Sequence, residues 1–125
     1  MRSLHRLVAA AVIMCSTAAV AQQAAPEQPA DAAQQKAVDE AYLGRCQTAA
    51  SKDLCACVVA VADSQLEDPT ERQVFFDFMM GDVDKAKTAR SLFGPQKNAQ
   101  FNAKLQKADV MLGERCDRLK PQPKQ

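Results

Sequence analysis

The chain has 125 residues, with 16 basic and 15 acidic side chains and a formal net charge of +1. A net charge this close to zero does not support nucleic-acid binding, which depends on a strongly basic surface. The length suits a single domain.

The first 21 residues have the pattern of a secretory signal peptide. A basic start, MRSLHR, precedes an apolar run over 7–21 that ends in Ala-Val-Ala. The run is too short to cross a bilayer, which takes roughly 20 residues as a helix. We therefore expect cleavage after residue 21, export to the periplasm or the cell exterior, and no transmembrane anchor.

Cleavage would remove His5 and Cys15, and so change the chemistry left in the chain. No histidine then remains, and the remaining cysteines are Cys46, Cys55, Cys57 and Cys116. An even number of cysteines in an exported chain predicts two disulfides. The absence of histidine excludes Ser-His-Asp and Cys-His nucleophilic sites and His-ligated zinc or copper.

Hydrolysis by two carboxylates needs no histidine and stays formally open. A domain with one tyrosine and no tryptophan, however, has few of the aromatic side chains that a carbohydrate-binding cleft would need. We therefore predict that the protein is not an enzyme and that it uses no metal and no cofactor.

Composition divides the rest of the chain into a leader, a domain and a tail. Residues 22–35 are rich in Ala, Gln and Pro and contain no large apolar side chain. Such a segment cannot bury enough surface to offset the ordering of its backbone, so we expect a disordered leader. Residues 120–125, KPQPKQ, predict a disordered tail for the same reason. The domain then spans 36–119.

Apolar periodicity predicts about five helices in this domain. The first, over about 36–50, places Cys46 on its buried stripe. The second, over about 52–66, begins after Ser51, a suitable N-cap. Its run VVAVA over 58–62 could also form a strand, but a lone strand would have no partner.

The third helix has the clearest start signal in the chain. Asp68 is placed to cap it, Pro69 suits the first helical position, and Glu71 lies where a capping box has a carboxylate. We expect this helix to stop at Gly81.

Two more helices complete the prediction. A short one over about 82–93 is closed by a Gly-Pro pair, and a long one follows over about 96–119. The long helix carries a continuous apolar stripe. Its members are Phe101, Leu105, Ala108, Leu112, Cys116 and Leu119. The fold class is therefore all-α, a small helical bundle stapled by disulfides.

The spacing of the cysteines limits how they pair. On a helix, Cys55 and Cys57 point about 200° apart, so each needs a partner elsewhere. If the first two helices form a hairpin near Ser51, Cys46 lies opposite Cys55. We therefore favour Cys46–Cys55 with Cys57–Cys116, although sequence leaves the swapped pairing, Cys46–Cys57 with Cys55–Cys116, open.

The same CxC motif supports a rival interpretation. Together with Met79, Met80 and Met111, two thiolates could hold Cu(I) through sulfur or take part in thiol redox chemistry. This interpretation requires free cysteines, and an oxidising compartment favours their pairing.

The third helix is apolar around most of its circumference. Residues 74–80 cover an arc of roughly 240°, with Asp77 outside it, whereas a surface helix needs only about 100°. One interpretation is a central helix surrounded by its neighbours. The other is that Phe76 and Met80, on the far flank, form a groove that binds a partner.

Charge is segregated along the domain. Residues 53–84 carry eight acidic side chains and only Arg72 as a base, and residues 85–107 carry six bases and no acid. Either the two halves neutralise each other within the fold, or they form a bipolar surface that attracts a charged partner or a second copy of the chain.

These observations favour a small exported protein that binds another envelope protein, with a homodimer as a further arrangement. In size, export signal and stapled helical build, the chain resembles acid-activated periplasmic chaperones and helical periplasmic immunity proteins that block cell-wall-degrading toxins. The resemblance implies two alternative functions, namely acid- or stress-conditional holding of clients and inhibition of a toxin.

Overall fold

The computed structural model describes residues 29–123, and within that range the fold is all-α, as predicted. The described part contains five α-helices and one short 3-10 helix. They are α1 (Pro29–Cys46), α2 (Lys52–Gln65), α3 (Pro69–Met79), α4 (Val83–Arg90), α5 (Pro95–Arg115) and η1 (Asp117–Leu119). The expected signal peptide, the leader before residue 29 and residues 124–125 lie outside the described part of the chain.

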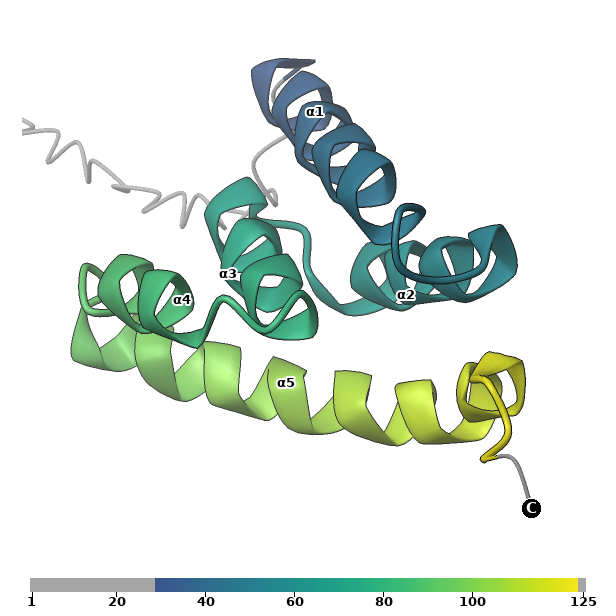
Figure 1. Cartoon of the computed structure of the whole chain (residues 1–125). Coiled ribbons are helices and arrows are strands. Elements are labelled where there is room, and N and C mark those ends of the chain that lie inside the picture. The colour runs from purple at the N-terminus through teal and green to yellow at the C-terminus, as the bar shows by residue number, and fades with distance from the viewer. Residues whose placement is uncertain (1–28, 124–125) are drawn as a thin grey trace, which may run out of the picture.

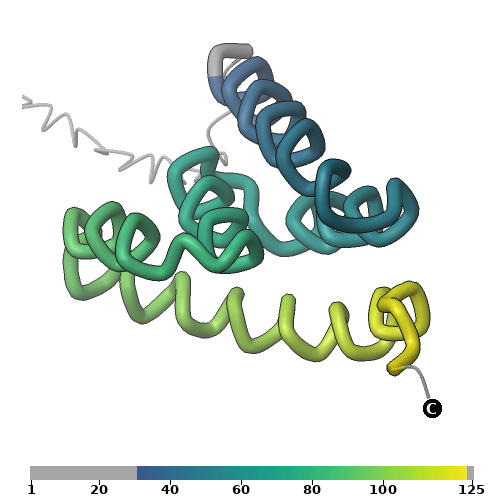
Figure 2. Tube along the Cα trace, in the orientation of Figure 1, coloured from purple at the N-terminus to yellow at the C-terminus, as the bar shows by residue number. Residues whose placement is uncertain are grey.

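The helices stack around α5, the longest of them. In Figure 1, α5 runs along one side of the molecule, with α3 and α4 over its N-terminal part and α2 over its C-terminal part. Helix α1 packs against α2 and α3 on the side away from α5. The tube in Figure 2 shows the same path. The chain passes from α1 through α2, α3 and α4 and then returns along α5.

Two helix starts follow the predicted capping. The Ser51 hydroxyl accepts a hydrogen bond from the Leu54 N–H at 3.2 Å. The Asp68 carboxylate accepts from the N–H of Thr70 at 2.7 Å and of Glu71 at 3.1 Å. The Glu71 side chain does not complete a capping box, because it pairs with a lysine of α5 instead. Backbone donors at both starts are satisfied by side-chain oxygens.

The first helix begins earlier than predicted. Helix α1 starts at Pro29, so residues 29–35, expected to belong to a disordered leader, are helical. Alanine and glutamine are good helix formers, and propensity extends the helix where no large apolar side chain is available to pack. The same helix ends at Cys46, four residues before the predicted end at residue 50.

The remaining ends lie close to their predicted positions. Helix α3 ends at Met79, and Gly81 follows with a φ of 80°, a left-handed conformation that favours glycine. Helix α5 ends at Arg115, and the chain tightens into η1 where the prediction had continued a single helix to Leu119.

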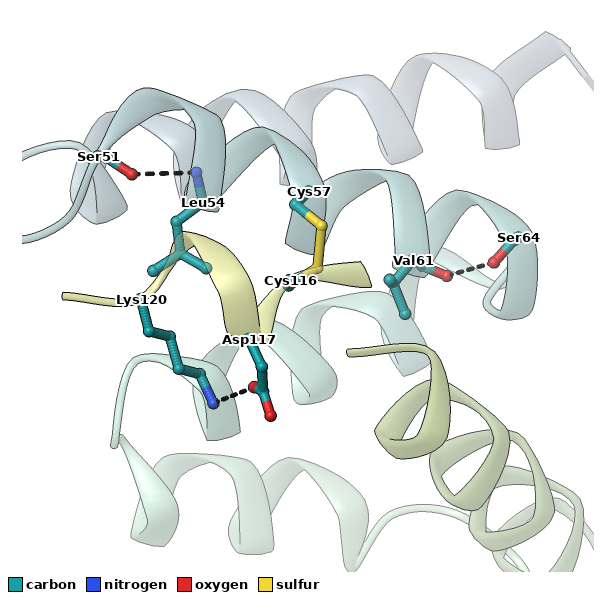
Figure 3. Close-up of a disulfide and its surroundings, with 8 residues drawn as sticks. All are labelled: Ser51, Leu54, Cys57, Val61, Ser64, Cys116, Asp117 and Lys120. Atoms are coloured by element: carbon teal, nitrogen blue, oxygen red, sulfur yellow. Dashed lines mark hydrogen bonds and ion pairs between the residues drawn. A yellow bond between two sulfur atoms is a disulfide. The ribbon is translucent and has the colours of Figure 1, made fainter. Parts of the chain in front are cut away.

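Both disulfides have the favoured pairing. Cys46 is bonded to Cys55, and Cys57 is bonded to Cys116. The two cysteines of the CxC motif thus leave α2 on opposite sides, one toward α1 and the other toward the end of α5, as Figure 3 shows for the second. Helix α2 is covalently tied to both of its neighbours.

The core lies between these helices, with α3 at its centre. Val74, Phe75 and Phe76 of α3 are buried, as are Phe101 and Ala108 on the predicted stripe of α5. Other buried members come from α1 and α2, among them Tyr42, Val61, Ala62 and Leu66. Over residues 29–123, none of the helices combines the length and the apolar character needed to cross a membrane.

Candidate functional site: an apolar groove and a braced cavity

An open groove of about 620 Å³ lies between α1, α3 and the connection from α4 to α5. We call it the α1–α3 groove. Its apolar lining comprises Ala37, Val38, Pro69, Val74, Ala89, Leu92 and Phe93, and Gln34, Thr70, Gln73, Gly94 and Lys97 complete it. This composition, mostly apolar with a few polar groups, is typical of binding sites.

The two long walls of the groove are formed by residues of α1 and α3 that lie on one face of each helix. Gln34, Ala37 and Val38 are spaced by three and four residues and therefore share one face of α1. Gln73 and Val74 lie on the face of α3 that looks toward them. Leu92, in the turn after α4, is 85 % exposed, the largest value among the exposed large hydrophobic side chains of the described chain. The groove therefore ends at an apolar side chain that no part of residues 29–123 covers.

The only charged side chain in the groove lining is already neutralised. The Lys97 ammonium lies 2.7 Å from the Asp68 carboxylate and 4.5 Å from the centre of the Phe93 ring. Partial burial would raise the pKa of Asp68, but hydrogen bonds from Lys97, from Thr70 and from two backbone N–H groups outweigh it and lower this pKa to about 2. The groove thus offers an apolar surface without a free charge.

Helix α3 also carries a buried arginine. Arg72 donates from Nε to the Leu66 carbonyl at 3.0 Å. Its Nη1 donates to Asp39 of α1 at 2.7 Å and to Asp63 of α2 at 2.8 Å. Burial raises the pKa of Asp39, and the hydrogen bond and charge of Arg72 act against that rise. Arg72 therefore joins three helices through one guanidinium group.

Two buried carboxylates of α3 pair with lysines from the basic half of the chain. Glu71 accepts from Lys104 of α5 at 2.6 Å, and Asp77 accepts from Lys85 of α4 at 2.9 Å. Asp77 also accepts from Gln73 at 3.0 Å. The two charged halves of the sequence thus pair with each other in part inside the fold, which favours the interpretation that they neutralise each other over that of a bipolar surface.

The proposed Phe76 and Met80 surface is corrected by the structure. Phe76 is only 2 % exposed, and its ring stacks on that of Tyr42 with 4.2 Å between the ring centres. It belongs to the core because α1 covers the flank of α3 that sequence alone left open. Met80 is partly buried and lines a second cavity. Asp77, expected outside the apolar arc, is buried at 1 % exposure, where its Oδ1 accepts from Lys85 and Gln73 while its Oδ2 has no hydrogen-bond partner within residues 29–123.

The second cavity, of about 320 Å³, lies where the two disulfides converge. We call it the Tyr42 cavity. It is lined by Tyr42, Cys46, Ala49, Ala50, Leu54, Val58, Met79, Met80, Leu112, Cys116, Asp117 and Lys120. Figure 3 shows Leu54 directed toward the C-terminal segment that carries Asp117 and Lys120, whose side chains pair at 2.5 Å.

The sulfur atoms do not form a copper site in this structure. All four cysteines of the described chain are in disulfides, so the thiolates that Cu(I) would need are already bonded. Met79 and Met80 line the Tyr42 cavity, while the Met111 sulfur accepts a hydrogen bond from Gln65 at 3.3 Å in a separate groove. Within residues 29–123, no group of three or more His, Cys, Asp or Glu side chains is placed to hold a metal ion.

Sequence reasoning did not identify the residues of the α1–α3 groove. The strongest signal it left unused is the Leu92-Phe93 pair directly before Gly94, two large apolar side chains at the end of an otherwise polar helix. Comparison with known proteins adds no assignment, because no protein-family model, no curated protein and no solved structure matches the chain.

Proposed function

We propose that this protein is a non-enzymatic binding module of the cell envelope, and that it accommodates an apolar segment of a partner polypeptide in the α1–α3 groove. The observation that carries the proposal is the exposed Leu92 at the end of a preformed apolar groove of about 620 Å³. Contiguous apolar surface that is open to solvent is a mark of interaction sites.

The lining also defines the chemistry of the partner. Because Lys97 is paired with Asp68, the groove has no unpaired charge to attract an ionic group. Two helices, α1 and α3, form its long walls, as in grooves that bind the apolar face of an amphipathic helix. The proposed partner therefore contributes apolar side chains at helical spacing.

Crosslinking from the groove identifies the partner. A photo-activated amino acid at position 92 is expected to crosslink an envelope polypeptide in cells, and the same probe at position 110 is the control. Val110 is also exposed, at 59 %, but lies on α5 outside the groove. Crosslinking only to a second copy of the chain would replace the partner by a homodimer and contradict the proposal.

Affinity measurements with the identified partner then test the groove. Leu92→Asp is expected to weaken binding at least tenfold, because it places a charge in an apolar contact, whereas Val110→Asp should change it less than twofold. Both side chains are exposed, so neither change should reduce the helical content measured by circular dichroism. Equal affinity for both variants would contradict the role of the groove.

A second candidate function, acid-conditional holding of clients, rests on a separate observation. Helix α3 is joined by ion pairs to α1, α2, α4 and α5, through Arg72, Asp77 and Glu71. In strong acid the chain loses its negative charges and keeps its cations, and the resulting self-repulsion would open the surfaces around α3. Circular dichroism and binding of an apolar dye, compared at pH 7 and pH 2, test this candidate. Unchanged signals would exclude it.

A further inference from the structure

The Tyr42 cavity has walls from four parts of the chain. The end of α1 and the turn after it contribute Tyr42, Ala49 and Ala50, and α2 contributes Leu54 and Val58. Met79 and Met80 come from the end of α3 and the residue after it, and Leu112 comes from α5. The space is therefore bounded by segments that are distant in sequence, and it opens to solvent on one side.

The disulfides hold these walls at fixed distances. Cys46 and Cys116 both line the cavity, and their bonds to Cys55 and Cys57 tie α1 and the end of α5 to α2. A site whose walls are fixed before binding loses little conformational entropy when a ligand enters. The geometry is that of a preformed small-molecule site rather than of a flexible surface.

Tyr42 brings an unused hydrogen-bonding group to this wall. Its side chain is buried at 5 % exposure, and burial alone raises the pKa of its hydroxyl. Within residues 29–123, no protein group forms a hydrogen bond with that hydroxyl. Within the same residues the fully buried side-chain oxygens without a partner are those of Asp39 and Asp77, so the Tyr42 hydroxyl keeps access to solvent and can donate a hydrogen bond to a molecule that enters the cavity.

The size and charge of the cavity limit what enters it. An apolar cavity of about 150 Å³ accepts benzene, and the Tyr42 cavity, at about 320 Å³, has roughly twice that volume. Asp117 and Lys120, the charged residues of the lining, pair with each other at 2.5 Å. The remaining walls are apolar, and the sulfur atoms of Met79 and Met80 suit contact with an aromatic ring.

We propose that the Tyr42 cavity binds an uncharged bicyclic aromatic molecule that carries one hydrogen-bond acceptor, with the Tyr42 hydroxyl as donor. This site is separate from the α1–α3 groove, and none of its lining residues belongs to that groove. The inference therefore stands or falls independently of the proposed protein partner.

Quinoline and naphthalene are suitable probes because they have the same shape and differ in one ring atom, the acceptor nitrogen of quinoline. Calorimetry at pH 7 with the disulfide-bonded protein is expected to show that both bind. Tyr42→Phe should weaken quinoline roughly fivefold, the effect of one lost hydrogen bond, and should change naphthalene less than twofold. Chemical-shift changes should be confined to the cavity residues, such as Leu54, Val58 and Leu112.

A filling variant and a control complete the test. Ala49→Trp places a large ring in the cavity from an exposed position of its wall and should abolish binding of both probes. Val110→Trp should leave both affinities unchanged. Absence of quinoline binding at about 1 mM, or an equal effect of Tyr42→Phe on both probes, would overturn the proposal.

Discussion

The two ends of α5 are anchored by different forces. Its C-terminal end is tied to α2 by the Cys57–Cys116 disulfide. Its N-terminal half is held to α3 by two ion pairs, Lys97–Asp68 at 2.7 Å and Lys104–Glu71 at 2.6 Å. Hydrogen bonds from Arg90 of α4 to Asn98 and Asn102 add to this end.

Because of this difference, the two ends of α5 should respond to different conditions, one to reduction and the other to acid. A disulfide restricts the unfolded chain and does not respond to pH or salt, but it is lost on reduction. An ion pair depends instead on the protonation of its carboxylate. We therefore expect reductant to loosen the C-terminal end of α5 and acid to loosen the N-terminal half.

The largest expected effect comes from the disulfides. Replacing Cys57 and Cys116 by serine opens a loop with a sequence separation of 59, whereas replacing Cys46 and Cys55 opens one of 9. Chain-entropy estimates give losses of about 4 and about 2.5 kcal/mol in the free energy of unfolding. Urea unfolding of both double variants measures the difference. A larger loss for Cys46 and Cys55 would contradict the assignment of the longer loop as the main staple.

A smaller effect is expected at the ion-paired end. Lys104→Ala leaves the buried Glu71 carboxylate without its lysine. Breaking a fully buried pair costs about 3–5 kcal/mol, and because Lys104 is partly exposed we expect a loss of about 2 kcal/mol. Lys107→Ala, which removes an exposed lysine on the same helix, is the matched control and should change the free energy of unfolding by less than about 0.5 kcal/mol. Similar losses for the two variants would show that the pair does not hold this end.

The smallest effect is a change in pH dependence at Asp68. Its pKa of about 2 in the folded protein lies below the usual value of 3.8, so its contribution to stability is present above pH 4 and is lost as the pH falls toward 2. After allowance for solvent screening of this partly exposed pair, we expect about 1 kcal/mol. Asp68→Asn should remove this part of the acid dependence.

The free energy of unfolding is measured for the wild type and for Asp68→Asn between pH 5 and pH 2. Asp39 acts with the opposite sign, because its pKa is raised and acid therefore favours its folded state. The difference between the wild type and Asp68→Asn removes that contribution, which both proteins share. A difference that stays constant over this range would mean that Asp68 does not respond to acid as described.

Local rules predicted much of the fold. The 200° separation of Cys55 and Cys57 required partners on two sides of α2, and the structure has them in α1 and at the end of α5. Ser51 and Asp68 cap the helices that they were expected to cap. These features depend on spacing within a few residues, which sequence contains directly. The early start of α1 was missed because the prediction relied on apolar periodicity, and residues 29–35 have none.

The candidate sites could not be predicted in the same way. The burial of Phe76 depends on Tyr42, which approaches from another helix, and the burial of Asp77 depends on Lys85 of α4. The α1–α3 groove is formed by α1, α3 and the turn after α4, which are far apart in sequence, and no local pattern encodes how they pack. Non-local packing therefore decides which apolar side chains remain available to a partner.

Hydrogen exchange along α5 tests most directly whether its two ends are held by different forces. At pH 7 in the presence of a phosphine reductant, we predict that protection falls first over the C-terminal turns of α5 and in α1. At pH 2 with intact disulfides, we predict that protection falls first over α3, α4 and the N-terminal half of α5. Uniform loss of protection along α5 under both conditions would contradict this account.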